Sequence, residues 1–253
     1  MVQSITDLHN GLISILDVQA GMSVLDLGCG KGAALSAVFE AIGSNGFVVA
    51  ADRDQEGLEA IQAKFNCDEK CEQLQCMPLE MSKLPLPFEN NSFDRILCHN
   101  VIECIVDKVS LIDECFRILK PTGKLLVSHH DFDSAVFNSE FVNLTRDLVH
   151  GFADTTQDWQ DTSDGQVGRK IPGLLATSSF AGPSMLETIA IAETRYSPDT
   201  YGYRFSRWIL DIAVKSGHIP SDYLRAWLSD LERKADQGTY YFCICLMVAI
   251  GQK

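Results

Sequence analysis

The sequence predicts an α/β fold with a mostly parallel sheet, and three observations carry that prediction. Apolar strand segments alternate with amphipathic helical segments over the first half of the chain. A glycine-rich turn separates the first strand from its helix, and polar side chains follow the ends of the next four strands. Such alternation favours parallel strands that are joined by right-handed crossovers and covered by helices.

Seven strands are expected, from short apolar runs that turn residues interrupt. The last of them is apolar on both alternating faces, which is typical of a strand that lies inside a sheet. Pro85 and Pro87 exclude a helix or a central strand between the third and fourth strands. The expected strands cover residues 23–27, 47–51, 74–79, 93–98, 124–129, 185–193 and 240–250.

Apolar residues at helical spacing predict the helices. The first twenty residues form one expected helix that ends at Gly21, and the others cover 31–42, 55–65, 109–119, 201–215 and 221–235. Residues 132–170 are polar and only partly helical. We therefore expect a ligand-binding core over 1–131, a largely helical substrate cap inserted over 132–180, and a completion of the sheet over 181–253 with a two-helix insertion at about 200–237.

The composition narrows the compartment and the partners. The net charge is -13 and no cluster of Lys and Arg is present, so a nucleic-acid partner is not expected. No secretion signal begins the chain, and its longest apolar run, 241–250, is too short to span a bilayer. Most of the nine cysteines lie in apolar runs, as reduced thiols do. We expect a cytoplasmic protein that does not bind membranes.

No metal site is expected. Cys67, Cys71 and Cys76 cluster in the sequence, but they form no C-x-x-C pair and have no histidine nearby.

The most informative stretch is 24–32, an apolar strand that ends in an acidic residue and a G-x-G-x-G turn. Gly28, Gly30 and Gly32 allow a positive φ and let a ligand approach the main chain. The spacing differs from the G-x-G-x-x-G dinucleotide fingerprint, and an ordinary strand–helix turn is the alternative. Asp26 ends the strand and needs a partner or a cationic ligand, because a lone buried carboxylate is costly.

In an open α/β sheet, ligands bind beyond the carboxyl ends of the strands. Asp52 follows the second expected strand and suits a ribose diol, because a carboxylate accepts hydrogen bonds from two adjacent hydroxyls. A helix N-terminal carboxylate that the helix dipole favours is the alternative. The other residues at this edge are Arg53, Glu80, Met81, His99, Asn100, His129, His130 and Asp131.

An ordered series of segments makes the chain resemble the class I S-adenosylmethionine-dependent methyltransferases, and among them the small-molecule enzymes of the quinone-biosynthesis type. The most specific segment is Leu-Pro-Phe-Glu-Asn-Asn-Ser-Phe-Asp at 86–94. Two positions depart from the family pattern: Cys104 stands where His is common, and Glu80 where Asp is commoner. The resemblance implies a Rossmann-like three-layer sandwich whose seven-stranded sheet has an antiparallel last strand. The matching segments are 24–32, 48–52, 80–85, 86–94, 100–103 and 117–125.

The resemblance also implies how S-adenosylmethionine is held. Asp26, Gly28 and Gly30 would surround its amino-acid end. Asp52 would bind the ribose hydroxyls with Arg53 beside the adenine. Four further residues are implied to contact the cofactor: Glu80 and Met81 at the adenine, and His99 and Asn100 near the sulfonium.

A catalytic base is needed only if the acceptor must lose a proton. The candidates are His129, His130 and Asp131, of which the two histidines would point to opposite faces of a strand; His99 is a further candidate. Capping of the strand end is the alternative role.

The cap is expected to bind the acceptor. Aromatic, acidic and cationic side chains occur together there and would suit a cationic or heteroaromatic molecule; packing of cap on core is the alternative. The candidate substrate-binding residues are Trp159, Arg169, Tyr201, Tyr203 and Arg204.

The expected function is transfer of a methyl group from S-adenosylmethionine to a nitrogen or oxygen of a small metabolite, with carbon left open. One alternative is a nicotinamide-dependent oxidoreductase, which the glycine spacing and segment 86–94 disfavour. Another is a non-catalytic cofactor-binding protein on the same fold. A homodimer is compatible with the sequence.

Overall fold

In the computed structural model, which describes residues 5–65, 72–157 and 160–253, seven strands form one sheet in the order β3-β2-β1-β4-β5-β7-β6. The pairs among β1 to β5 are all parallel, whereas β7 runs antiparallel to both of its neighbours. This confirms the expected fold class. The strands are β1 (Ser23–Leu27), β2 (Phe47–Asp52), β3 (Leu74–Pro78), β4 (Phe93–His99), β5 (Leu119–Phe137), β6 (Met185–Glu193) and β7 (Phe242–Gln252).

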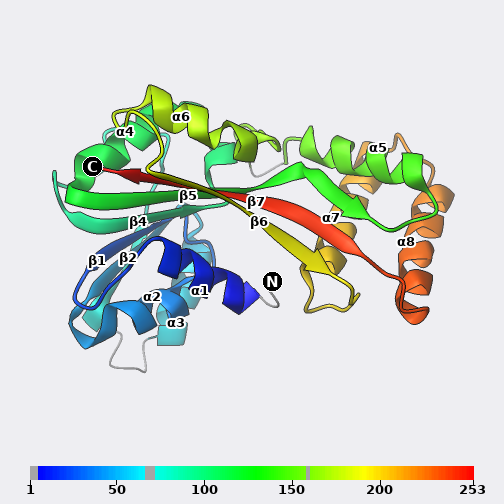
Figure 1. The fold of residues 1–253 in the computed structure, drawn as a ribbon, viewed down its shortest axis with the longest axis horizontal. Helices are drawn as coiled ribbons and strands as arrows, with labels where there is room; N and C mark the ends of the chain where they lie inside the picture. The colour runs from blue at the N-terminus through cyan, green and yellow to red at the C-terminus, as the bar shows by residue number, and fades with distance from the viewer. Residues whose placement is uncertain (1–4, 66–71, 158–159) are drawn as a thin grey trace.

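Helices cover both faces of the sheet and make the three layers. Figure 1 shows α4 and α6 over one face and α1, α2 and α3 over the other, while α5, α7 and α8 gather at the far end of the long strands. The helices are α1 (Ile5–Ile15), α2 (Leu35–Ile42), α3 (Gln55–Phe65), α4 (Lys108–Ile118), α5 (Val142–Ala153), α6 (Ile171–Thr177), α7 (Tyr201–Ser216) and α8 (Ser221–Asp236), with short 3-10 turns at η1 (Gly43–Asn45), η3 (Ile102–Cys104) and η4 (Val167–Lys170).

Two hydrophobic clusters lie on the two faces. One contains Val24 of β1 with Leu35 of α2, and the other contains Leu25 of β1 with Ile112 of α4. Successive strand residues point to opposite faces, so a strand that is covered on both sides is apolar throughout. This explains why the central strands could be recognised as continuous apolar runs.

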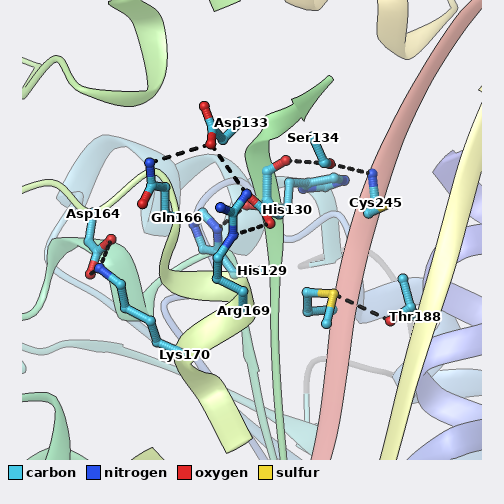
Figure 2. Close-up of polar contacts among 12 residues, drawn as sticks. His129, His130, Asp133, Ser134, Asp164, Gln166, Arg169, Lys170, Thr188 and Cys245 are labelled. Carbon is cyan, nitrogen blue, oxygen red and sulfur yellow. Dashed lines mark hydrogen bonds and ion pairs between the residues drawn. The ribbon is translucent and has the colours of Figure 1, made fainter. Parts of the chain in front are cut away.

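The strand β5 is much longer than the expected 124–129. It continues to Phe137 because β7 pairs with it along its length, from Lys124 opposite Gln252 to Phe137 opposite Phe242. Where the register shifts after Asp131, the Ser134 hydroxyl accepts a hydrogen bond from the Cys245 backbone N–H at 2.9 Å (Figure 2). The first residues of the expected cap are therefore strand, and the helical part begins at α5.

The first helix is shorter than expected, because α1 ends at Ile15 and Asp17 has a φ of +58°. Arg95 of β4 fixes this end: its Nε donates to the carbonyl oxygens of Leu16 and Asp17 at 2.9 and 3.0 Å. Among the described residues, no helix is long and apolar enough to cross a membrane, and no group of His, Cys, Asp and Glu could hold a metal ion. Cys67 and Cys71 lie outside the described residues.

Candidate functional site

A cleft of about 860 Å³ opens at the carboxyl ends of β1, β2 and β4. Its volume falls within the range of small-molecule sites. Seven of the residues predicted to bind a cofactor line it: Gly28, Gly30, Asp52, Arg53, Glu80, Met81 and Asn100. The structure therefore brings together residues from four separate segments, as the end-of-strand rule predicts.

The glycine turn forms one wall of this cleft. Gly28 and Gly30 have φ values of +79° and +52°. A Cβ on Gly28 would lie 2.2 Å from Cγ2 of Val101, whereas one on Gly30 would meet no atom within 4 Å. Gly28 is thus required by packing, and Gly30 leaves space that a ligand can fill.

Asp52 is held rigidly at the cleft. One carboxylate oxygen accepts the backbone N–H of Gly30 at 2.7 Å, and the other accepts that of Asp54 at 2.9 Å. The first bond ties the end of β2 to the glycine turn. The carboxylate keeps further lone pairs for a ligand hydroxyl.

Asp26 lies at the end of β1 and is 4% exposed, and it does not line the cleft. Its Oδ2 has no hydrogen-bond partner among the described residues. Burial, with a smaller contribution from the charge on Asp52, raises the pKa of the Asp26 carboxyl to about 7. A cation close to Asp26 would remove this cost.

At the other end of the cleft, the cap reaches the core. Arg53 Nη1 lies 3.2 Å from Oδ2 of Asp161, and both residues line the cleft. Met81 is buried, and Glu80 accepts a hydrogen bond from the Ser82 hydroxyl at 3.0 Å. The contribution of Asp161 was missed by the sequence analysis, because 108 residues separate it from Arg53.

Asn100 organises two of the predicted histidines. Its Nδ2 lies 3.1 Å from Nε2 of His99, and its Oδ1 accepts from the backbone N–H of His130 at 3.2 Å and lies 3.0 Å from that ring's Nδ1. His99 Nδ1 lies 2.8 Å from the Ser128 hydroxyl. With Asn100 Oδ1 as acceptor, His130 Nδ1 carries the proton and its Nε2 lone pair is bare.

Both of these rings are uncharged at neutral pH. Desolvation lowers the pKa of His99 to about 3, and it lowers the pKa of His130 well below its ordinary value. His130 is 1% exposed, and its Nε2 has no hydrogen-bond partner within the described part of the chain. Neither ring lines the cleft; Asn100 stands between them and it.

His129 and His130 both lie near the ring of Phe132, with ring centroids 5.3 and 6.4 Å from it. The Nδ1 of His129 lies 2.6 Å from the backbone carbonyl oxygen of His130, and its Nε2 lies 3.2 Å from Oε2 of Glu103. Both side chains are almost completely buried. The sequence alone does not indicate a role for Glu103, because its partners His129 and Gln160 come from β5 and the cap.

Asp131 is engaged by the cap. Arg169 of η4 donates to both of its carboxylate oxygens, from Nε at 2.7 Å and from Nη2 at 2.8 Å. Figure 2 shows Arg169 directed also at Asp133, which the Gln166 amide contacts from the same segment. Neither Asp131 nor Arg169 lines the cleft; together they fasten η4 to β5.

The remaining predicted acceptor residues lie on α7, except Trp159, which is outside the described residues. Tyr201 stacks on His130 with ring centroids 4.7 Å apart. Tyr203 packs against Tyr196 at 4.8 Å, and Arg204 donates to the backbone carbonyl of Thr200. Only Tyr201 therefore touches the histidine group, while the other two support the start of α7.

Comparison with known proteins shows which family the chain belongs to. A family model described as a methyltransferase domain matches residues 18–180. That match covers well over half of the chain, so the chain belongs to this methyltransferase domain family.

Curated relatives agree over shorter lengths. The chain is 26% identical over 243 residues to an uncharacterized 37.1 kDa protein of a Streptomyces fradiae transposon, a match that covers 95% of this chain and 65% of that protein. It is 31% identical over 114 residues to the demethylmenaquinone methyltransferase of Oceanobacillus iheyensis, covering 44% of this chain and 45% of the relative. The matches thus span less than two thirds of either relative.

Solved structures share the fold. A proposed methyltransferase of Bacillus halodurans has a TM-score of 0.62 at 15% identity, covering 97% of this chain and 98% of that one. The YcgJ protein of Bacillus subtilis has a TM-score of 0.58 at 18% identity, with the same coverage. At these identities the likeness shows the fold alone.

Proposed function

We propose that the protein transfers a methyl group from S-adenosylmethionine to a nitrogen or oxygen of a small molecule and releases S-adenosylhomocysteine. The observation that carries the proposal is the cleft, in which seven of the nine residues expected to hold this cofactor stand on one surface. Membership of the methyltransferase domain family supports the same donor chemistry.

The residues present fit S-adenosylmethionine. The positive charge at the amino-acid end of the cofactor would balance Asp26, whose Oδ2 has no hydrogen-bond partner among the described residues. The space beside Gly30 would admit that end of the cofactor. The anchored carboxylate of Asp52 suits the ribose hydroxyls. When bound, this cofactor supplies a methyl group whose bond to the sulfonium breaks with its electron pair left on sulfur. The chain's task is to align the acceptor, which contributes roughly 7–11 kcal/mol in well-oriented reactions.

The chemical class of the methyl acceptor is inferred from the residues of this chain. The demethylmenaquinone methyltransferases match 44–55% of this chain and 45–56% of their own length, so their acceptor does not transfer with the match. A small-molecule acceptor is supported by the size of the cleft, and the net charge of -13 disfavours nucleic acid.

Calorimetric titration with S-adenosylhomocysteine and with NAD tests the donor. We expect binding of the first and none of the second. Asp52→Ala removes the ribose partner and is expected to weaken S-adenosylhomocysteine binding by about 1.5–3 kcal/mol, which is about 10–100-fold in Kd. Glu187→Gln, an exposed carboxylate on β6, is the control and should leave the affinity unchanged.

Two results would contradict the proposal. Tight NAD binding without S-adenosylhomocysteine binding would favour an oxidoreductase. An unchanged affinity in Asp52→Ala would place the ribose elsewhere. Release of S-adenosylhomocysteine on screening candidate acceptors separates an enzyme from a non-catalytic binding protein.

A further inference from the structure

A second, much smaller space lies beside the turn η3, whose last residue lines the cofactor cleft. Its volume is about 10 Å³, room for about one water molecule. Glu103 faces this space, whereas the next residue, Cys104, lines the cleft. On the cap, Gln160 lines the second space and Asp161 lines the cleft. Two adjacent pairs of residues therefore form the partition between the two spaces.

Three aromatic residues, Phe132, Phe152 and Trp208, line this second space. The ring centroids of Phe152 and Trp208 are 4.6 Å apart, with an interplanar angle of 77°. Those of Phe152 and Phe132 are 5.1 Å apart, with an interplanar angle of 89°. Phe132 and Trp208 are 6.0 Å apart at 82°. All three contacts are edge-to-face. Ring faces carry negative potential and attract a cation within about 6 Å.

Glu103 lines the same space and is 4% exposed. Its Oε2 is close to Nε2 of His129 at 3.2 Å, but no donor in the described part of the chain meets hydrogen-bond geometry there. A buried carboxylate oxygen without a donor is costly unless a cation or an N–H group pairs with it. A carboxylate and aromatic rings around one small space favour an ammonium group.

Gln160 occupies the place of such a group. Its Nε2 donates to Oε1 of Glu103 at 3.0 Å and lies 3.4 Å from Sγ of Cys104, at the wall of the cofactor cleft. Its Oε1 accepts the backbone N–H of Gln157 at 2.9 Å. An amide N–H₂ donates two hydrogen bonds without a charge, whereas a protonated amine donates up to three and carries a positive charge.

We propose that this second space is the acceptor site, that it takes a protonated amine, and that the Gln160 amide holds the place of the acceptor nitrogen until the amine displaces it. The inference rests on the proposed methyl transfer and narrows it to nitrogen. An N–H bond of the ammonium breaks, its proton passes to Glu103, and the electron pair stays on nitrogen to form the new bond to the methyl carbon. His129, whose Nδ1 is held by a carbonyl, keeps its Nε2 toward Glu103.

The test is calorimetric titration of the protein, saturated with S-adenosylhomocysteine, with benzylamine and with benzyl alcohol, which differ in charge but hardly in shape. Wild type is expected to bind benzylamine about 10-fold more tightly. Glu103→Gln should lose that preference and keep its affinity for S-adenosylhomocysteine. Glu187→Gln removes an exposed carboxylate on β6 and should keep both the preference for benzylamine and the affinity for S-adenosylhomocysteine.

Gln160→Ala opens the space and is expected to tighten benzylamine binding. If Glu103→Gln fails to fold, Trp208→Leu replaces it and should weaken benzylamine more than benzyl alcohol. A Gln160→Ala variant that binds S-adenosylhomocysteine but does not prefer benzylamine overturns the inference alone. Retention of the preference in Glu103→Gln does the same. Failure of wild type to bind S-adenosylhomocysteine overturns the proposed function and the inference with it.

Discussion

Asp26 and Asp52 end neighbouring strands, yet their carboxylates have opposite surroundings. Asp52 accepts two backbone N–H groups, while one oxygen of Asp26 has no donor among the described residues. An unpartnered buried acceptor costs about 1–3 kcal/mol. At the scale of single residues, the site therefore holds one carboxylate that is already satisfied and one that lacks a cation.

Asp26→Asn should stabilise the free protein, and more so at high pH. The folded-state pKa of Asp26 is raised from 3.8 to about 7 by burial, so its contribution to stability is fully present below the unfolded pKa and is lost as the pH rises through about 7. We expect the substitution to raise the free energy of unfolding by about 1–3 kcal/mol at pH 8 and by less at pH 5. Thermal unfolding at both values measures this. A stabilisation that is larger at pH 5 would contradict the assignment.

At the scale of elements, the glycine turn combines packing with access. Gly28 touches Val101, which follows Asn100 at the end of β4, and Gly30 faces open space. The same backbone conformation therefore serves two different purposes at positions two residues apart.

Gly28→Ala and Gly30→Ala separate these purposes. Positive φ costs either alanine about 1–2 kcal/mol, and Gly28→Ala adds the clash with Val101. We expect Gly28→Ala to lose more stability in chemical denaturation, and Gly30→Ala to lose S-adenosylhomocysteine affinity at nearly normal stability. Equal affinities in Gly30→Ala and wild type would show that the space beside Gly30 does not receive the ligand.

Some of these elements could be predicted from the sequence, whereas others could not. The strands β1, β2 and β4 were recognisable because burial on both faces makes them continuous apolar runs, and their carboxyl ends share one edge. The length of β5 could not be predicted, because its extension to Phe137 depends on pairing with β7, which lies more than a hundred residues later in the chain. The group of Glu103, His129 and Gln160 was missed for the same reason: only tertiary structure brings these residues together.

At the scale of the whole molecule, the cap is joined to the core at both spaces. Arg169 fastens η4 to Asp131 on β5, and Asp161 pairs with Arg53 across the cleft. Gln160, next to Asp161, lines the second space. The same short segment of the cap thus borders the proposed donor site and the proposed acceptor site, which places the two on either side of Cys104.

A crystal structure with S-adenosylhomocysteine tests the central claim most directly. We expect the ribose hydroxyls to lie within hydrogen-bond distance of the Asp52 carboxylate, and the amino-acid end to lie against Gly30 and toward Asp26. The sulfur should face Asn100 and Cys104. A ligand bound outside this cleft, or bound in it with the ribose away from Asp52, would contradict the account.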